Sequence, residues 1–218
     1  MPYKAFIFDL DGTILNTLSD IANACNTMLQ RHGWPQHEDN AYRQFVGNGF
    51  AMLTRRVLPP SLLENLEDKA LQELIDEGKA LYHASLHDRT KPYDGIPEAL
   101  AELKKRNVSL AVLSNKPDPE TKELVSYFFP GIFSVVHGGR DGVPLKPDPA
   151  AVYETMAELG ATKETCAYVG DSNVDMKTAA NAGLFSIGVT WGFRGEEELA
   201  KANASAIVSR AEELLQYA

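Results

Sequence analysis

Polar side chains that could do chemistry follow three strand-like runs of the sequence. Asp9-Leu10-Asp11-Gly12-Thr13 follows the first run, Ser114-Asn115-Lys116 follows the second, and Gly170-Asp171-Ser172 follows the third, with Asp175 close behind. Lys146-Pro147 precedes the helical pattern that leads into the third run. Because ligands of open α/β sheets bind beyond the carboxyl ends of the strands, we expect these side chains to share one site.

The aspartates of this set indicate a cation site. If Asp9, Asp11 and Asp171 gather at one edge of a sheet, with Asp175 nearby, they repel one another and raise each other's pKa. A divalent cation removes that conflict. A set of oxygen ligands suits Mg²⁺, which also shares the phosphate oxygens of a substrate. The sequence therefore predicts Mg²⁺ as the cofactor.

The other polar residues of the set suit a phosphoryl group. The Ser114 hydroxyl and the Asn115 amide could donate hydrogen bonds to phosphoryl oxygens, and Lys146 could balance their charge. Gly12 and Thr13 allow a tight turn whose backbone N–H groups could hold an anion. These residue types favour a small phosphorylated metabolite as the substrate.

Asp9 and Asp11 could divide the chemistry of phosphoryl transfer. Residues i and i+2 of an extended strand point the same way, so we expect both carboxylates to face one substrate. One carboxylate could attack phosphorus to form an aspartyl-phosphate. The other could protonate the leaving oxygen and then deprotonate the water that hydrolyses this intermediate.

Strand-like and helical patterns alternate from about residue 91 to the end of the chain, after a first strand at Lys4 to Asp9. The later strand-like runs are Ser109 to Leu113, Ile132 to His137, Thr165 to Val169, Phe185 to Val189 and Ala204 to Val208. The helical patterns are Ile96 to Arg106, Glu120 to Phe129, Pro149 to Leu159, Asp175 to Ala182 and Ser209 to Gln216. This order predicts an α/β fold, a Rossmann-like parallel sheet with helices on both faces.

The stretch from 16 to 90 has no strand-like run. It shows four amphipathic helical patterns: Leu18 to His32, Ala41 to Val46, Phe50 to Leu58 and Leu62 to Leu86. We interpret it as an all-helical domain inserted after the first strand. The predicted core domain is then formed by 1–15 and 91–218, and the helical domain by 16–90.

The composition restricts the partners and the compartment. The chain of 218 residues has 30 acidic and 21 basic side chains, a formal net charge of -9. Nucleic acids and anionic membranes attract basic surfaces, so neither is an expected partner. Apolar runs are far shorter than the about 20 residues of a membrane span, and no signal peptide is visible, which favours a cytoplasmic protein. Cys25 and Cys166 are expected to be reduced thiols, at least one of them buried.

Taken together, the four motifs resemble those of the haloacid dehalogenase superfamily, in particular its phosphoglycolate-phosphatase-like group, whose helical cap follows the first strand. The resemblance implies that Asp9 is the nucleophile and Asp11 the general acid and base. It also implies that Mg²⁺ is held by the Asp9 carboxylate, the Asp11 backbone carbonyl and Asp171. Ser114 and Lys146 would bind the phosphoryl group, and Asp175 would support Asp171 or a metal-bound water.

The resemblance also gives expectations for specificity. The loop Phe45-Val46-Gly47-Asn48-Gly49 resembles the specificity turn of phosphoglycolate phosphatases, and Arg55 or Arg56 could meet a substrate carboxylate. The expected activity is Mg²⁺-dependent hydrolysis of a phosphomonoester, with 2-phosphoglycolate as the best single substrate. A pyrophosphatase, a sugar phosphomutase and a phospho-accepting signalling module remain alternatives. The oligomeric state, monomer or homodimer, stays open.

Overall fold

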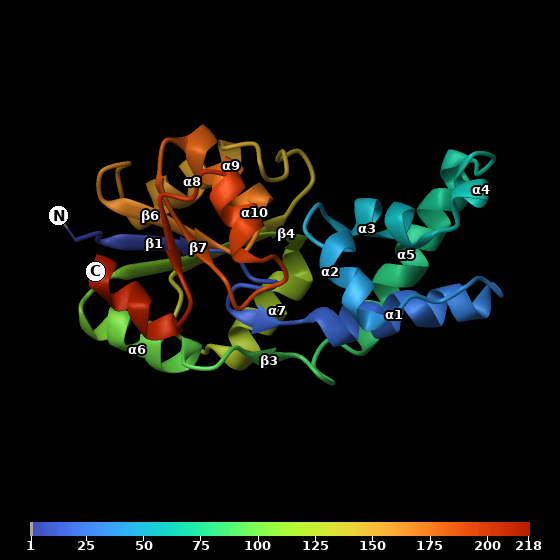
Figure 1. Cartoon of the computed structure of the whole chain (residues 1–218), viewed down its shortest axis with the longest axis horizontal. Coiled ribbons are helices and arrows are strands. Elements are labelled where there is room, and N and C mark those ends of the chain that lie inside the picture. Colours follow the sequence, from blue (N-terminus) through green and yellow to red (C-terminus); the bar gives the residue numbers. More distant parts are fainter. Residues whose placement is uncertain (1) are drawn as a thin grey trace. The chain divides into compact units, whose positions relative to one another are not determined.

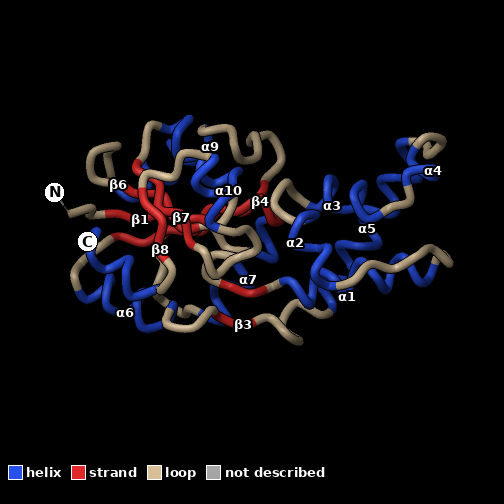
Figure 2. The backbone as a smooth tube through the Cα atoms, viewed as in Figure 1, coloured by secondary structure: helices blue, strands red, loops and turns tan. Residues whose placement is uncertain are grey.

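The computed structural model describes residues 2–218, and the chain divides into two compact units. The core unit comprises 1–16 and 91–218, and the helical unit comprises Thr17–Thr90. Figure 2 shows the strands of the sheet side by side in the core unit, and helices joined by loops in the helical unit. None of the described helices is long and apolar enough to cross a membrane.

The core unit is built on a six-stranded parallel sheet with the order β5-β4-β1-β6-β7-β8. Its strands are β1 (Ala5–Phe8), β4 (Ser109–Pro117), β5 (Val135–Gly139), β6 (Cys166–Gly170), β7 (Phe185–Val189) and β8 (Ala206–Val208). This architecture confirms the α/β fold predicted from the sequence. A separate antiparallel pair, β2 (Leu15–Asn16) and β3 (Lys91–Pro92), lies where the chain leaves the core unit and where it returns.

Helices cover both faces of the sheet (Figure 1). They are α6 (Ile96–Lys105), α7 (Asp118–Phe128), α8 (Ala150–Leu159), α9 (Asn173–Ala182) and α10 (Glu196–Lys201), followed by the 3-10 helix η2 (Ala211–Tyr217). The connections through α6 and α7 step from β1 to β4 and β5, whereas those through α8, α9 and α10 run back to β6, β7 and β8. Right-handed crossovers place these two groups of helices on opposite faces.

The central strand β1 is apolar and fully enclosed. Phe6, Ile7 and Phe8 have no exposed surface, and burying such a side chain contributes about 2 kcal/mol. Phe8 pairs with Val112 of β4 on one side and Val169 of β6 on the other. This pairing fixes the carboxyl ends of three neighbouring strands at one edge.

The helical unit contains α1 (Leu18–Arg31), η1 (Asp39–Ala41), α2 (Tyr42–Phe45), α3 (Phe50–Val57), α4 (Pro60–Leu63) and α5 (Asp68–Ala84). Apolar faces of α1 and α5 pack together, with α3 also against α5. The buried Asp20 of α1 accepts hydrogen bonds from the backbone N–H groups of Arg89 and Thr90 and from the Thr90 hydroxyl. This contact joins the two ends of the unit.

Several predicted elements differ from the structure. The pattern from Leu62 to Leu86 forms two helices, because Glu67 adopts an extended conformation before α5. The strand predicted from Ile132 begins only at Val135, since the Ile132 N–H closes a turn onto Phe129. The C-terminal helix is a 3-10 helix.

Candidate active site

The site lies where the chain connections diverge, at the carboxyl ends of β1 and β6. The chain runs from β1 towards α6 on one face and from β6 to α9 on the other, which leaves a crevice at the adjacent strand ends. Asp9 follows β1, and its N–H donates to the Val169 carbonyl at 2.9 Å. Asp9, Asp171 and Asp175 are buried, with carboxylate oxygens within 4.8 Å of one another.

Lys146 lies among these carboxylates. Its Nζ is 2.8 Å from Asp9 Oδ1 and 2.8 Å from Asp175 Oδ1, and only 5% of the residue is exposed. Asn115 holds the backbone of this lysine on both sides. The Asn115 Nδ2 donates to the Lys146 carbonyl at 3.0 Å, and the Lys146 N–H donates to Asn115 Oδ1 at 2.8 Å. Asn115, which was expected to bind phosphate, thus positions Lys146.

Burial and neighbouring carboxylates shift the pKa values of Asp9 and Asp171 upwards. Burial, then the neighbouring Asp175, raises the pKa of Asp9 to about 7, although Lys146 opposes the rise. Burial, together with Asp175 and Asp9, raises the pKa of Asp171 well above its ordinary value. Burial lowers the pKa of Lys146, but Asp175 and Asp9 outweigh it and raise that pKa. Asp9, Asp171 and Asp175 together therefore exceed the charge that Lys146 alone can neutralise.

Asp11 and Ser114 lie beside this centre, and Asp11 has its own cation. Lys116 Nζ is 3.1 Å from Asp11 Oδ1, with the lysine side chain 4% exposed. The Lys116 N–H donates to Ser114 Oγ at 3.2 Å, so the hydroxyl proton of Ser114 is left to donate elsewhere. Lys116 belongs to the motif that follows the second strand-like run, but its role could not be predicted from the sequence. Nothing in the motif shows that this lysine faces Asp11.

The backbone N–H groups of the turn after β1 have carbonyl partners within the turn. The Gly12 N–H donates to the Leu15 carbonyl at 2.9 Å, and the Thr13 N–H donates to the Leu10 carbonyl at 3.2 Å. Both N–H groups therefore donate to carbonyls inside the turn, and a phosphate contact of Gly12 and Thr13 stays a prediction. Gly12 has φ +88, and a Cβ there would collide with the Asp171 carboxylate.

The loop after β7 holds Asp171 in place. The Phe193 N–H donates to Asp171 Oδ2 at 2.6 Å, and the Thr13 hydroxyl lies 3.4 Å from Asp171 Oδ1. A Cβ on Gly192 would overlap Asp171, so only glycine fits there. Trp191 Nε1 donates to the Thr13 carbonyl at 2.9 Å. The role of this loop was not predicted from the sequence. The signal was present, because the loop follows a strand-like run and β7 pairs with β6, the strand that precedes Asp171.

Asp175 is fully committed to protein partners. Its Oδ1 pairs with Lys146, while its Oδ2 accepts hydrogen bonds from the Ser172 N–H at 3.1 Å and hydroxyl at 2.6 Å. Ser172 in turn caps α9, completing a capping box. Asp175 therefore connects the start of α9 to Lys146.

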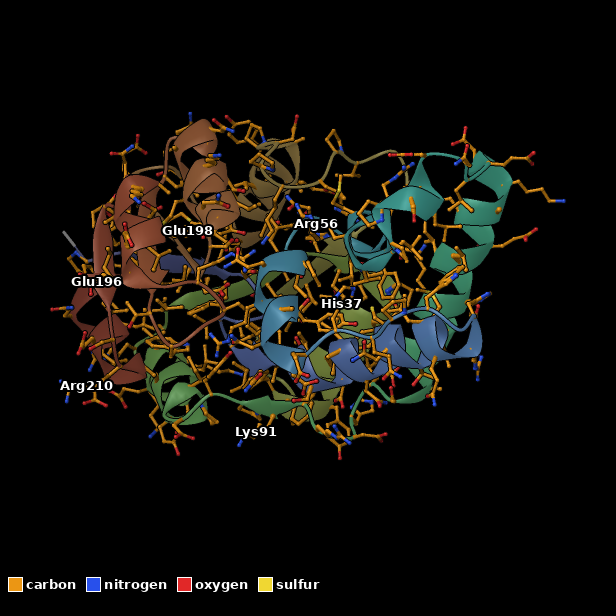
Figure 3. The ribbon with its side chains drawn as sticks, turned by 45° about the vertical axis from the view of Figure 1, so that its right-hand side comes forward. His37, Arg56, Lys91, Glu196, Glu198 and Arg210 are labelled. Carbon is orange, nitrogen blue, oxygen red and sulfur yellow. The ribbon has the colours of Figure 1, made fainter. Side chains whose placement is uncertain are left out.

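The residues expected to give specificity lie in the helical unit. Arg56 donates to the Phe45 carbonyl at 2.8 Å and to Asn48 Oδ1 at 2.7 Å, so it holds the 45–48 turn (Figure 3). Arg55 is exposed.

Both cysteines, Cys25 and Cys166, are buried thiols, and burial raises the pKa of each to about 12. This confirms the expectation of reduced, buried cysteines.

Comparison with known proteins identifies the family. A sequence model of haloacid dehalogenase-like hydrolases matches residues 6–189. The chain belongs to this family. It is 33% identical over 213 residues to a phosphoglycolate phosphatase of Pseudomonas syringae pv. syringae, covering 97% of this chain and 78% of the relative. It is 32% identical over 216 residues to a phosphoglycolate phosphatase of Photorhabdus laumondii, covering 97% and 91%.

Solved structures extend the likeness to the fold. A candidate phosphoglycolate phosphatase of Lactobacillus delbrueckii subsp. bulgaricus superposes with a TM-score of 0.90 at 32% identity, covering 98% of this chain and 97% of that one.

In the present chain, the buried carboxylates fit a divalent cation. Their pKa values are raised in the protein alone, and oxygen atoms of Asp9 and Asp171 lie close enough to share one ion.

Proposed function

We propose that this hydrolase is a phosphatase that cleaves a small phosphomonoester through an aspartyl-phosphate on Asp9, with 2-phosphoglycolate as the leading substrate. The observation that carries the proposal is the position of Asp9 at the β1 end, 2.8 Å from the Lys146 amine and within 4.8 Å of an Asp171 carboxylate oxygen. The relatives named phosphoglycolate phosphatase support the choice of substrate.

The chemistry follows from two carboxylates with different partners. An Asp9 oxygen attacks phosphorus, a new O–P bond forms, and the bond from phosphorus to the substrate oxygen breaks. Asp11 acts as the general acid that gives a proton to that leaving oxygen. Water then attacks phosphorus while Asp11 takes a proton from it, which releases inorganic phosphate and restores Asp9.

Two residues bind the transferring group, and a third positions the general acid. Lys146 supplies positive charge next to Asp9, and the Ser114 hydroxyl donates to a phosphoryl oxygen. Lys116 holds the Asp11 carboxylate in place. These donors are fixed before substrate arrives, so little reorganisation is needed during the reaction.

The proposed cofactor is Mg²⁺. The carboxylates of Asp9 and Asp171, with the backbone carbonyl of Asp11, would hold it, and when bound it supplies charge that stabilises the phosphoryl oxygens. Asp175 acts indirectly, because both of its oxygens already have protein partners. The helical unit is proposed as the cap that selects the substrate, through Asn48 and Arg55.

A substrate panel tests this function. Free phosphate is measured with 2-phosphoglycolate, pyrophosphate and hexose phosphates, each with Mg²⁺ and with EDTA. The proposal expects phosphate release that needs Mg²⁺, with the highest kcat/KM for 2-phosphoglycolate and none for the Asp9→Asn variant. Preference for pyrophosphate would indicate a pyrophosphatase, isomer interconversion with little phosphate release a mutase, and lasting phosphorylation of Asp9 without turnover a signalling module.

A further inference from the structure

We propose that a second pocket of the core unit binds a planar ring carrying one anionic group, the chemistry of a nucleoside monophosphate. The pocket, here called the β2–β3 pocket, has a volume of about 470 Å³. Its chemically capable lining residues are Lys91, Tyr93, Asp94, Trp191, Arg210 and Glu212. It contains none of Asp9, Ser114, Lys146 or Asp171.

Two cations of this pocket suit the anionic group. Lys91 begins the return strand β3, and Arg210 precedes η2 (Figure 3). The Arg210 guanidinium lies 3.1 Å from Glu212 Oε1 and 3.0 Å from Glu213 Oε1, so an anion in the pocket competes with these two carboxylates for it. A guanidinium and an ammonium recognise phosphate through charge-assisted hydrogen bonds.

The other walls of the pocket suit a ring with polar substituents. Tyr93 and Trp191 are half-buried and offer aromatic surface to a planar ring. Asp94 and Glu212 offer carboxylate oxygens to hydroxyl or amino donors. The volume is within the usual range of small-molecule sites, about 300–1,000 Å³. An inorganic anion alone would leave the aromatic walls unused, so the combination points to a ring and an anion in one ligand.

Trp191 provides a direct signal for binding at this pocket. Its Nε1 donates to the Thr13 carbonyl, which fixes the ring at the pocket wall. Trp34, the other of the two tryptophans, lies in the helical unit. In a Trp34→Phe variant, indole fluorescence therefore comes from Trp191 alone.

The test is a fluorescence titration of the full chain carrying Trp34→Phe and Asp9→Asn, the second change preventing turnover. AMP is the probe, with adenosine and inorganic phosphate as its two halves. We expect a saturable change with AMP and binding weaker by about tenfold or more for each half. Lys91→Ala and Arg210→Ala should each weaken AMP binding by about tenfold. Two control variants should leave AMP binding unchanged. They are Lys105→Ala, at an exposed position outside the pocket, and Ser114→Ala, at the strand-end site.

Two results would overturn the proposal. One is the absence of any saturable change with AMP. The other is a titration that Ser114→Ala abolishes while Lys91→Ala and Arg210→Ala leave it intact, which would place the nucleotide at the catalytic edge. Because the assay measures binding in a chain without Asp9, its outcome is independent of the phosphatase activity.

Discussion

Replacing Asp9 by asparagine should make the metal-free protein more stable while removing its activity. The pKa of Asp9 rises from 3.8 to about 7, first because the group is buried and then because Asp175 is close. Each pKa unit corresponds to about 1.4 kcal/mol, so ionised Asp9 disfavours the folded state by on the order of 4 kcal/mol above pH 7. Asparagine keeps the shape of the side chain and removes this charge.

The sign of the pH dependence follows from the same shift. An acid whose pKa is raised in the folded state binds its proton more tightly there, so stability falls as the pH rises from about 4 to about 7. The variant should therefore exceed the wild type by less than half of the full difference at about pH 5, and by nearly all of it at about pH 8. For a chain of this size, the gain at high pH corresponds to roughly 10 °C in Tm.

The assay is thermal denaturation in EDTA at both pH values, with Asp141→Asn as a control at an exposed aspartate. Added Mg²⁺ should then stabilise the wild type more than the variant, because it offsets the charge that the variant lacks. Equal or lower stability of Asp9→Asn at high pH, or a difference that does not change with pH, would refute the electrostatic reasoning.

Three further substitutions test the surroundings of Asp9. Lys146→Met should lower kcat/KM by roughly hundredfold or more, because it removes a fixed cation from the transferring group, and steady-state kinetics would detect it. Gly192→Ala should push Asp171 aside and weaken Mg²⁺ activation by about tenfold, measured as a metal titration of activity; an unchanged midpoint would contradict it. Ser172→Ala breaks the capping box with Asp175 and should cost about 1 kcal/mol in urea denaturation, with Ser126→Ala, an exposed serine, as control.

The strand-end residues could be predicted from sequence because each follows a short apolar run. The parallel arrangement of β1, β4 and β6 then brings Asp9, Ser114 and Asp171 to one edge. Their own contacts could not be predicted, because these depend on side chains from distant parts of the chain. The Asn115 contact with the Lys146 backbone spans 31 residues, and the Phe193 contact with Asp171 spans 22.

Other local features could not be predicted because sequence patterns do not specify backbone contacts. The sequence Asp-Gly-Thr indicates a tight turn but does not show which carbonyls its N–H groups reach, and here they are Leu15 and Leu10. The strands β2 and β3 have two residues each, too few for a periodic pattern. Helical periodicity likewise cannot locate the interruption between α4 and α5, because apolar residues recur on both sides of it.

The most direct test of the central claim is to trap phosphate on Asp9. In Asp11→Asn, p-nitrophenyl phosphate should still phosphorylate the enzyme, because its leaving group departs without a proton, whereas hydrolysis of the intermediate lacks its base. Acid quench and peptide mass spectrometry should then find the phosphate on the peptide that contains Asp9. Phosphate on another residue, or release of p-nitrophenol with no phosphorylated enzyme at any time, would contradict the account.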